Sequence, residues 1–114
     1  MQRTSEQKRT DIPPGTLYLL ILKTLSAGPL HGYGIAQHIK RLSEEVLRIE
    51  EGSLYPALQR MLVKGWVTSE WVQAGPKRRA RVYRLTPLGR KQLATEVSTF
   101  TRAMEAIMRV IQPA

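Results

Sequence analysis

The chain has 114 residues, a length that predicts a single domain. Apolar residues make up 42% and charged residues 24%, which excludes disorder along the whole chain, and the lack of cysteine excludes disulfides and thiolate metal sites. Residues 1–10 are polar, without the apolar core of a signal peptide, and the longest apolar run, Leu19–Leu22, is much shorter than a membrane span. We therefore expect a cytoplasmic protein with no membrane partner.

The net charge of +9 is concentrated in one short part of the chain. Residues 11–74 balance their acids and bases, whereas residues 75–91 contain basic charges alone. These bases are Lys77, Arg78, Arg79, Arg81, Arg84, Arg90 and Lys91. A basic patch focused in this way indicates a polyanionic partner. The alternative is a charged run that serves solubility alone.

Residues 1–12 are predicted to form a flexible, basic N-terminal arm. From Thr16 to Ala27 a helix is predicted whose apolar residues lie on nearly all sides, which requires burial on more than one side and indicates a partner subunit. A turn then leads to a second predicted helix, Tyr33–Leu42, and Val46–Ile49 alternates weakly, as a very short strand would.

Ser53–Lys64 is the third predicted helix, because its apolar side chains gather on one face. That core face consists of Leu54, Ala57, Leu58, Met61 and Leu62. Pro56 lies on the opposite face and is acceptable if it stands in the first turn, where its missing N–H has no helical acceptor. Gly65 is predicted to end the helix.

A β-hairpin is predicted next, with Trp66–Gln73 as its first strand and Arg81–Thr86 as its returning strand. Residues 74–80 are predicted to form a loop too long for a tight two-residue turn, so that the hairpin has a projecting basic tip. On the returning strand, Tyr83 and Leu85 are expected to face the core.

Thr86 as N-cap and Pro87 as first helical residue predict a last helix that runs to Gln112. Its apolar residues alternate at spacings of four and three, the pattern of a heptad seam. The seam consists of Leu93, Val97, Phe100, Met104, Ile107 and Ile111. We expect it to form a dimer interface together with Leu17 and Leu20. The alternative is that the last helix packs on its own domain.

This order of elements is that of a winged helix-turn-helix. The predicted fold is therefore mainly α with a small β-hairpin (α+β), in which residues 13–86 form the DNA-binding domain and residues 87–114 the dimerisation helix. In this design the third helix enters the major groove of double-stranded DNA. The hairpin, or wing, reaches the backbone or the minor groove.

The candidate DNA-binding residues follow from these two roles. A recognition helix needs small or hydrogen-bonding groups, and a wing needs cations that contact phosphates. The recognition-helix candidates are Ser53, Tyr55, Pro56, Gln59 and Arg60. The candidates for the wing and for backbone contacts are Tyr33, Lys64, Lys77, Arg78 and Arg79. At the start of the second helix, Tyr33 either donates to a phosphate or packs.

Four segments resemble the PadR family of bacterial transcriptional regulators in order and spacing. They are Leu25–Gly34, Glu51–Leu58, Gly65–Val67 and Val82–Gly89. The resemblance implies a homodimeric winged-helix repressor of the compact type, with a single C-terminal dimerisation helix. The resulting hypothesis is a sequence-specific regulator that binds an inverted-repeat operator.

The resemblance also implies a small hydrophobic or aromatic effector, because many members respond to such compounds. A cavity between subunits, lined by Leu17, Leu20, Phe100 and Met104, would suit it, since methionine adapts to varied ligands. A fully packed interface is equally consistent with the sequence. The last helix lacks the tryptophan with which some members hold a planar drug.

Two other functions are alternatives to DNA recognition. One is a winged-helix module for protein–protein interaction without DNA sequence specificity, which has no need of the cations at residues 77–79. The other is a sequence-indifferent RNA binder, which needs exposed stacking aromatics, whereas the few aromatic residues here are expected mostly to serve the core.

No motif in the sequence predicts an enzyme or a cofactor site. His31 and His38 lack a carboxylate at ligand spacing, so no metal site is predicted, and His31 is expected to cap the second helix. The glutamates of residues 44–51 are expected to be solvated charges of loops and helix ends rather than a catalytic pair.

Overall fold

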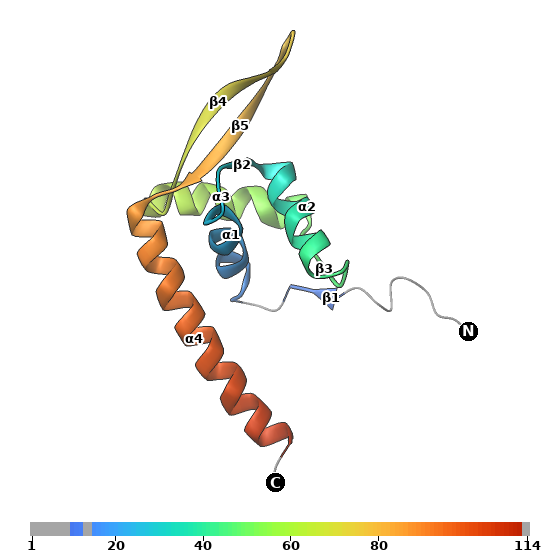
Figure 1. Cartoon of the computed structure of the whole chain (residues 1–114), viewed down its shortest axis with the longest axis vertical. Coiled ribbons are helices and arrows are strands. Elements are labelled where there is room, and N and C mark those ends of the chain that lie inside the picture. The colour runs from blue at the N-terminus through green and yellow to red at the C-terminus, as the bar shows by residue number, and fades with distance from the viewer. Residues whose placement is uncertain (1–9, 13–14, 113–114) are drawn as a thin grey trace, which may run out of the picture.

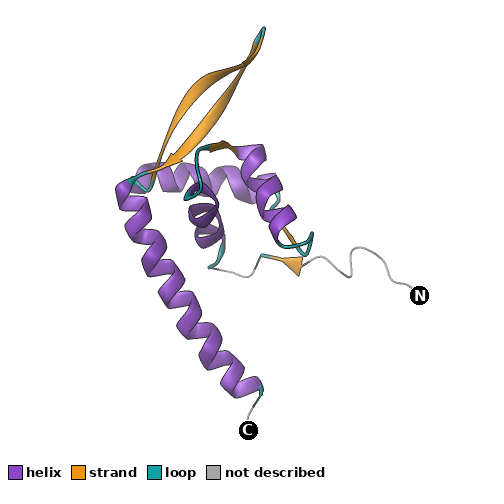
Figure 2. Cartoon of the chain, in the orientation of Figure 1, coloured by secondary structure: helices purple, strands orange, loops and turns teal. Residues whose placement is uncertain are grey.

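The computed structural model describes residues 10–12 and 15–112, which form a winged helix-turn-helix with a long last helix (Figure 1, Figure 2). The elements are β1 Thr10–Asp11, α1 Leu17–Leu25, β2 Leu30–His31, α2 Gly32–Leu42, β3 Leu47–Arg48, α3 Glu51–Lys64, β4 Val67–Gly75, β5 Arg78–Leu85 and α4 Pro87–Ile111. The hairpin β4–β5 projects from one side of the three packed helices, and α4 runs away from the other (Figure 1). The predicted fold class is confirmed.

The core lies between α1, α2, α3 and the root of the hairpin. The predicted core face of α3 is buried, with Leu54, Ala57, Leu58 and Met61 at most 1% exposed. The other buried apolar residues are Ile21, Leu22, Leu25, Ile35, Ile39, Ile49, Val67, Tyr83 and Leu85. Helix α3 therefore buries the stripe that its periodicity predicted, except for Leu62, which is half-buried against the core.

The structure corrects the place of Pro56 in the third helix. Because α3 begins at Glu51 rather than Ser53, Pro56 lies in its second turn and has no N–H for the carbonyl of Gly52. Both residues are exposed, so water can reach this carbonyl. Gly65 ends the helix with a φ of 78°, as predicted.

Strand β5 is the middle strand of a three-stranded antiparallel sheet, β2–β5–β4. The register pairs Leu30 with Tyr83, so that β2 and the start of α2 lie beside the root of the hairpin. On the other side of β5, Trp71 pairs with Arg81, and Gln73 pairs with Arg79.

The predicted long loop at the tip of the hairpin is wrong. Residues 78–80 belong to β5, and Gly75 pairs with Arg78, so Pro76 and Lys77 form a tight two-residue turn. A register shift between Gln73 and Gly75 absorbs the extra residue of β4. The wing is therefore a longer ribbon than predicted.

Residues 10 and 11, which the sequence placed in a flexible arm, form β1 and pair in parallel with β3. The register is Thr10 with Leu47 and Asp11 with Arg48. Residues 1–9 of the predicted arm lie outside the described residues.

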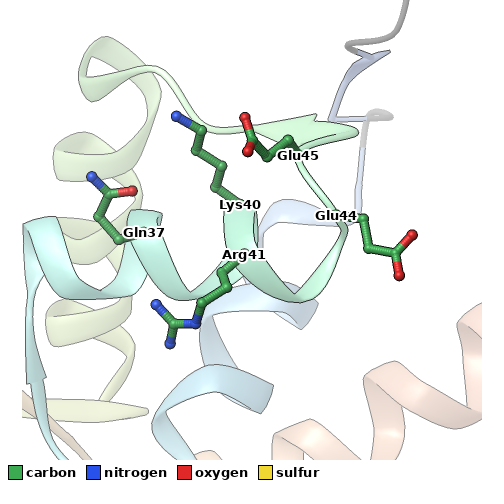
Figure 3. Close-up of a pocket in the computed structure, with 5 residues that line it drawn as sticks. All are labelled: Gln37, Lys40, Arg41, Glu44 and Glu45. Atoms are coloured by element: carbon green, nitrogen blue, oxygen red, sulfur yellow. The ribbon is translucent and has the colours of Figure 1, made fainter.

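Helix α2 ends in a turn with two left-handed glutamates. The N–H of Glu44 donates to the carbonyl of Arg41 at 3.1 Å, and that of Glu45 to Lys40 at 2.8 Å, a Schellman motif. Their φ values, 54° and 67°, lie in the region that favours glycine. Figure 3 shows the two carboxylates pointing in different directions, so they do not form a pair.

Helix α4 is fixed at its start against the chain that leaves α3. The side chain of Thr86 accepts a hydrogen bond from the N–H of Gly89 at 2.9 Å and lies 2.7 Å from the carbonyl of Gly65, to which it donates. A Cβ on Gly89 would lie 2.1 Å from the carbonyl oxygen of Trp66. Only glycine allows this approach of α4 to the root of β4.

Most of the predicted seam of α4 is uncovered. Leu93 packs against the core, but Val97, Phe100, Met104 and Ile107 are 38–46% exposed. Farther along, Ile111 is 64% exposed. The alternative that α4 packs on its own domain therefore holds at its start alone. Within residues 10–12 and 15–112, no helix is long and apolar enough to span a membrane.

Candidate nucleic-acid interface

One face of α3 presents the predicted recognition residues to solvent. Ser53, Tyr55, Pro56, Gln59 and Arg60 are all exposed, opposite the buried face that holds the helix on the core. The hydroxyl of Ser53 and the amide of Gln59 are groups that can bond to base edges.

Tyr55 lies against the start of α2. Its ring is next to Gly32, where a Cβ would stand 2.7 Å from the ring carbon Cε1. The same part of α2 carries Tyr33, 61% exposed and stacked on His31 with the ring centroids 6.4 Å apart. The start of α2 therefore lies beside the first half of α3.

His31 caps α2, as predicted. Its Nδ1 accepts a hydrogen bond from the N–H of Gly34 at 2.9 Å. The hydroxyl of Tyr33 accepts a hydrogen bond from the side-chain amide of Gln37, which leaves the phenolic O–H as a donor directed away from that amide. A tyrosine donor at a helix N-terminus can bind a phosphate oxygen.

The two cations in the second half of α3 are packed on aromatic rings. Arg60 donates from Nε to the hydroxyl of Tyr18 at 2.6 Å, and its Cζ lies 5.7 Å from the centroid of that ring. The Lys64 ammonium lies 5.2 Å from the ring of Trp66. Tyr18 and Trp66 meet edge to face at 5.4 Å. This group of side chains joins α3 to α1, so Arg60 is held toward α1.

In the wing the structure reveals two residues that the sequence did not single out, Trp71 and Arg81. Trp71 is 57% exposed, and the guanidinium carbons of Arg79 and Arg81 lie 5.3 Å and 5.9 Å from its centroid. The predicted cations Lys77, Arg78 and Arg79 are exposed at or near the tip. The long loop predicted for residues 74–80 hid this contact, because the tight turn and the register shift of β4 together place Trp71 opposite Arg81.

Tyr83 connects the wing to the recognition helix. Burial raises the pKa of its hydroxyl, the charge of Arg81 opposes this shift, and Tyr55 adds to it. The three side chains therefore lie near one another where β5, α3 and the start of α2 meet. Tyr83 stays neutral and packs, while its neighbours face outward.

The described residues contain no group of three or more His, Cys, Asp and Glu side chains that could hold a metal ion. An open hollow of about 460 Å³ lies at the end of α2 (Figure 3). It is lined by Gln37, Lys40, Arg41, Glu44 and Glu45. The surface formed by α2, α3 and the wing carries hydrogen-bond donors and cations. Such groups can contact the phosphates and base edges of DNA.

Comparison with known proteins gives the following relatives. A family model described as "Transcriptional regulator PadR-like family" matches residues 21–95. An uncharacterized 37.1 kDa protein in transposon TN4556 of Streptomyces fradiae is 39% identical over 84 residues, which cover 74% of this chain and 23% of that protein. The chain thus spans less than a quarter of that relative. The transcriptional regulator Rv3488 of Mycobacterium tuberculosis is 34% identical over 93 residues, 82% of this chain and 79% of that protein.

Solved structures are similar over most of the chain. A transcriptional regulator from Clostridium thermocellum has a TM-score of 0.81 at 26% identity, covering 86% of this chain and 95% of that one. Bacillus subtilis PadR in complex with operator DNA has a TM-score of 0.68 at 27% identity, covering 75% of this chain and 48% of that one.

Proposed function

Because the chain belongs to the PadR-like family of transcriptional regulators, we propose that it is a homodimeric repressor that binds an inverted-repeat operator in double-stranded DNA. The observation that carries this proposal is the exposed polar face of α3 beside a wing whose cations Lys77, Arg78, Arg79 and Arg81 form no ion pair with the described residues. Membership of this family makes the chain a regulator rather than an enzyme.

Ser53, Tyr55 and Gln59 face the major groove in this proposal. Lys77, Arg78 and Arg79 contact phosphates from the wing. Phosphate contacts set position and most of the affinity, while contacts to base edges set specificity. Tyr33 adds a phosphate contact at the start of α2, which lies beside α3.

The dimer follows from the uncovered seam of α4. Val97, Phe100, Met104 and Ile107 form an apolar stripe that a monomer leaves in water, and a second copy of the same stripe is its natural cover. Two-fold symmetry then presents two α3 helices to DNA. Their half-sites are expected about 34–36 Å apart, one helical turn of DNA.

We also propose that a small aromatic compound releases the DNA. An apolar groove of about 450 Å³ between α1, α2 and β3 has the size for such a ligand; Leu20, Ile39, Leu42 and Leu47 are among its lining residues. A ligand releases DNA only if it favours one dimer geometry over another. If planar aromatic dyes shift neither the melting temperature nor the DNA affinity, direct sensing is wrong.

The experiment that tests the main proposal is selection of bound duplexes from a random-sequence pool by the full chain. We expect enrichment of an inverted repeat with half-sites about one helical turn apart. The rival function, a protein-docking module, predicts no enrichment of any sequence. Pools recovered without a common motif would therefore overturn the proposal.

A further inference from the structure

The two faces of the wing differ in chemistry. Cross-strand pairs share a face, so the register assigns each residue of the hairpin to one side. We call one side the indole face; beyond the buried root of the hairpin it consists of the exposed Trp71, Gln73 and Arg79 and the half-buried Ser69 and Arg81. The opposite face consists of Thr68, Glu70, Val72, Ala80, Val82 and Arg84.

On the indole face, Trp71 and its neighbours hold two arginines. The guanidinium of Arg79 lies over the indole ring at 5.3 Å, and that of Arg81 lies near the same ring at 5.9 Å. Arg81 also lies 5.8 Å from the ring of Tyr83, and its Nε donates to the hydroxyl of Ser69 at 2.9 Å. Arg81 is therefore held at three points.

The charges on the two faces are compensated differently. On the opposite face, Arg84 lies 3.8 Å from the carboxylate of Glu70. Within residues 10–12 and 15–112, neither Arg79 nor Arg81 has a carboxylate within ion-pair distance. The indole face therefore presents two positive charges with no acidic partner, organised by an exposed tryptophan.

We propose that Trp71 is a positioning residue that holds Arg79 and Arg81 ready for phosphates, so that the wing contacts DNA through its indole face. The inference rests on the proposed DNA binding and adds three residues to it: Trp71 and Arg81, with no earlier assigned role, and Gln73 beside them. At the root of the hairpin this face reaches Tyr83, which is buried in the core.

The planar shape of the guanidinium group explains how an aromatic ring can hold an arginine ready for a phosphate. Stacking on a ring uses the flat face of the group and leaves the N–H donors in its plane free for phosphate oxygens. An arginine that is already ordered loses less side-chain entropy when it binds, which favours the complex. Because the indole of Trp71 is exposed, it adds little to the hydrophobic core. The ordering of the two arginines explains why a tryptophan stands at this position of the wing.

The test measures binding of the full chain to a fluorescein-labelled random-sequence duplex of about 30 base pairs, long enough for two half-sites, by anisotropy at several salt concentrations. Trp71→Leu keeps the charge and an apolar side chain but removes the ring. We expect it to weaken binding roughly tenfold, the effect of freeing two arginines. Trp71→Phe keeps a ring and should retain most of the affinity.

Two comparisons separate positioning from a general loss of structure. In a chain that already carries Arg79→Ala and Arg81→Ala, Trp71→Leu should change the affinity no further. Arg81→Ala should lower the slope of log K against log salt by about 0.9 for each subunit, the value for one phosphate contact, and so by about 1.8 for the proposed dimer. Arg84→Ala removes the same charge from the opposite face and should leave the slope unchanged.

The inference is overturned if Trp71→Leu binds DNA as tightly as the unchanged chain. It is overturned as well if Trp71→Leu still lowers the DNA affinity of a chain that lacks both arginines. It is also overturned if Arg84→Ala lowers the slope as much as Arg81→Ala, a comparison that stands even if Trp71→Leu fails to fold. Failure of the proposed DNA binding looks different, because the unchanged chain would then bind no duplex.

Discussion

The ring of Tyr55 in α3 lies against the backbone of Gly32 at the start of α2, where a Cβ would come within 2.7 Å of Cε1 and 2.8 Å of the hydroxyl. Two of the segments that resemble the PadR family, Leu25–Gly34 and Glu51–Leu58, therefore meet at this contact. It sets how closely the first half of α3 approaches the N-terminus of α2, and so the relative position of the recognition face and Tyr33.

We predict that Gly32→Ala destabilises the fold by roughly 1–3 kcal/mol, the cost of overpacking, because the ring must move. The measurement is urea unfolding. Gly52→Ala is the matched control: nothing lies within 4 Å of a Cβ there, and alanine suits a helix better than glycine. If Gly32→Ala lowers the free energy of unfolding less in a Tyr55→Leu background, the clash lies at this ring. An equal decrease would place the clash elsewhere.

Glu44→Gly should stabilise the protein by about 1 kcal/mol, because glycine adopts the left-handed conformation of the Schellman turn without the steric cost that glutamate pays. Thermal and urea unfolding both report this change. Glu51→Gly is the control at a helical position of α3 and should destabilise instead. Equal effects at the two positions would contradict the conformational explanation.

Phe100→Glu in the seam of α4 should separate the proposed dimer into monomers, because a carboxylate placed in an apolar interface has no partner there. Sedimentation or light scattering at micromolar concentration gives the mass. Ser98→Glu, with the same added charge away from the seam, should leave the mass unchanged. An unchanged chain that is already monomeric would contradict the dimer.

Gln59→Ala and Lys77→Ala should affect DNA binding in different ways. Loss of Gln59 should reduce the preference for operator over scrambled duplex by roughly 1–3 kcal/mol, the value of a bidentate base contact. Loss of Lys77 should weaken binding to both duplexes alike and reduce the salt slope by about 0.9 for each subunit, about 1.8 for the proposed dimer. Titrations of both duplexes at several salt concentrations measure these quantities. The opposite pattern would mean that the roles are reversed.

The helices could be predicted from the sequence because their information is local. The apolar stripe of α3 and the cap at Thr86 each depend on residues a turn apart, and both occur as predicted. The two-residue pairing of β1 with β3 could not be predicted, since it joins Thr10 to Leu47 with no pattern of its own. The left-handed Glu44 also contradicts the residue preference that such predictions use.

The candidate site was predictable in part for the same reason. The exposed face of α3 follows from helical periodicity, so its residues were placed correctly on the surface. The attachment of Arg60 to Tyr18 joins residues far apart in the chain and depends on tertiary packing. The contact between Trp71 and Arg81 depends on the register of the two strands. The loop predicted for residues 74–80 is too long and implies a different register, so the two residues were missed.

The glycine at position 89 has a mechanical consequence. Its backbone touches that of Trp66, so α4 joins the wing and α3 without a flexible connection. The 25 residues of α4 make a rigid arm of about 37 Å at 1.5 Å per residue. If α4 tilts by about 10° about its far end in a dimer, its first residue and the winged-helix domain fixed to it shift by about 6 Å. Half-site spacing is then set by the crossing angle of two such arms.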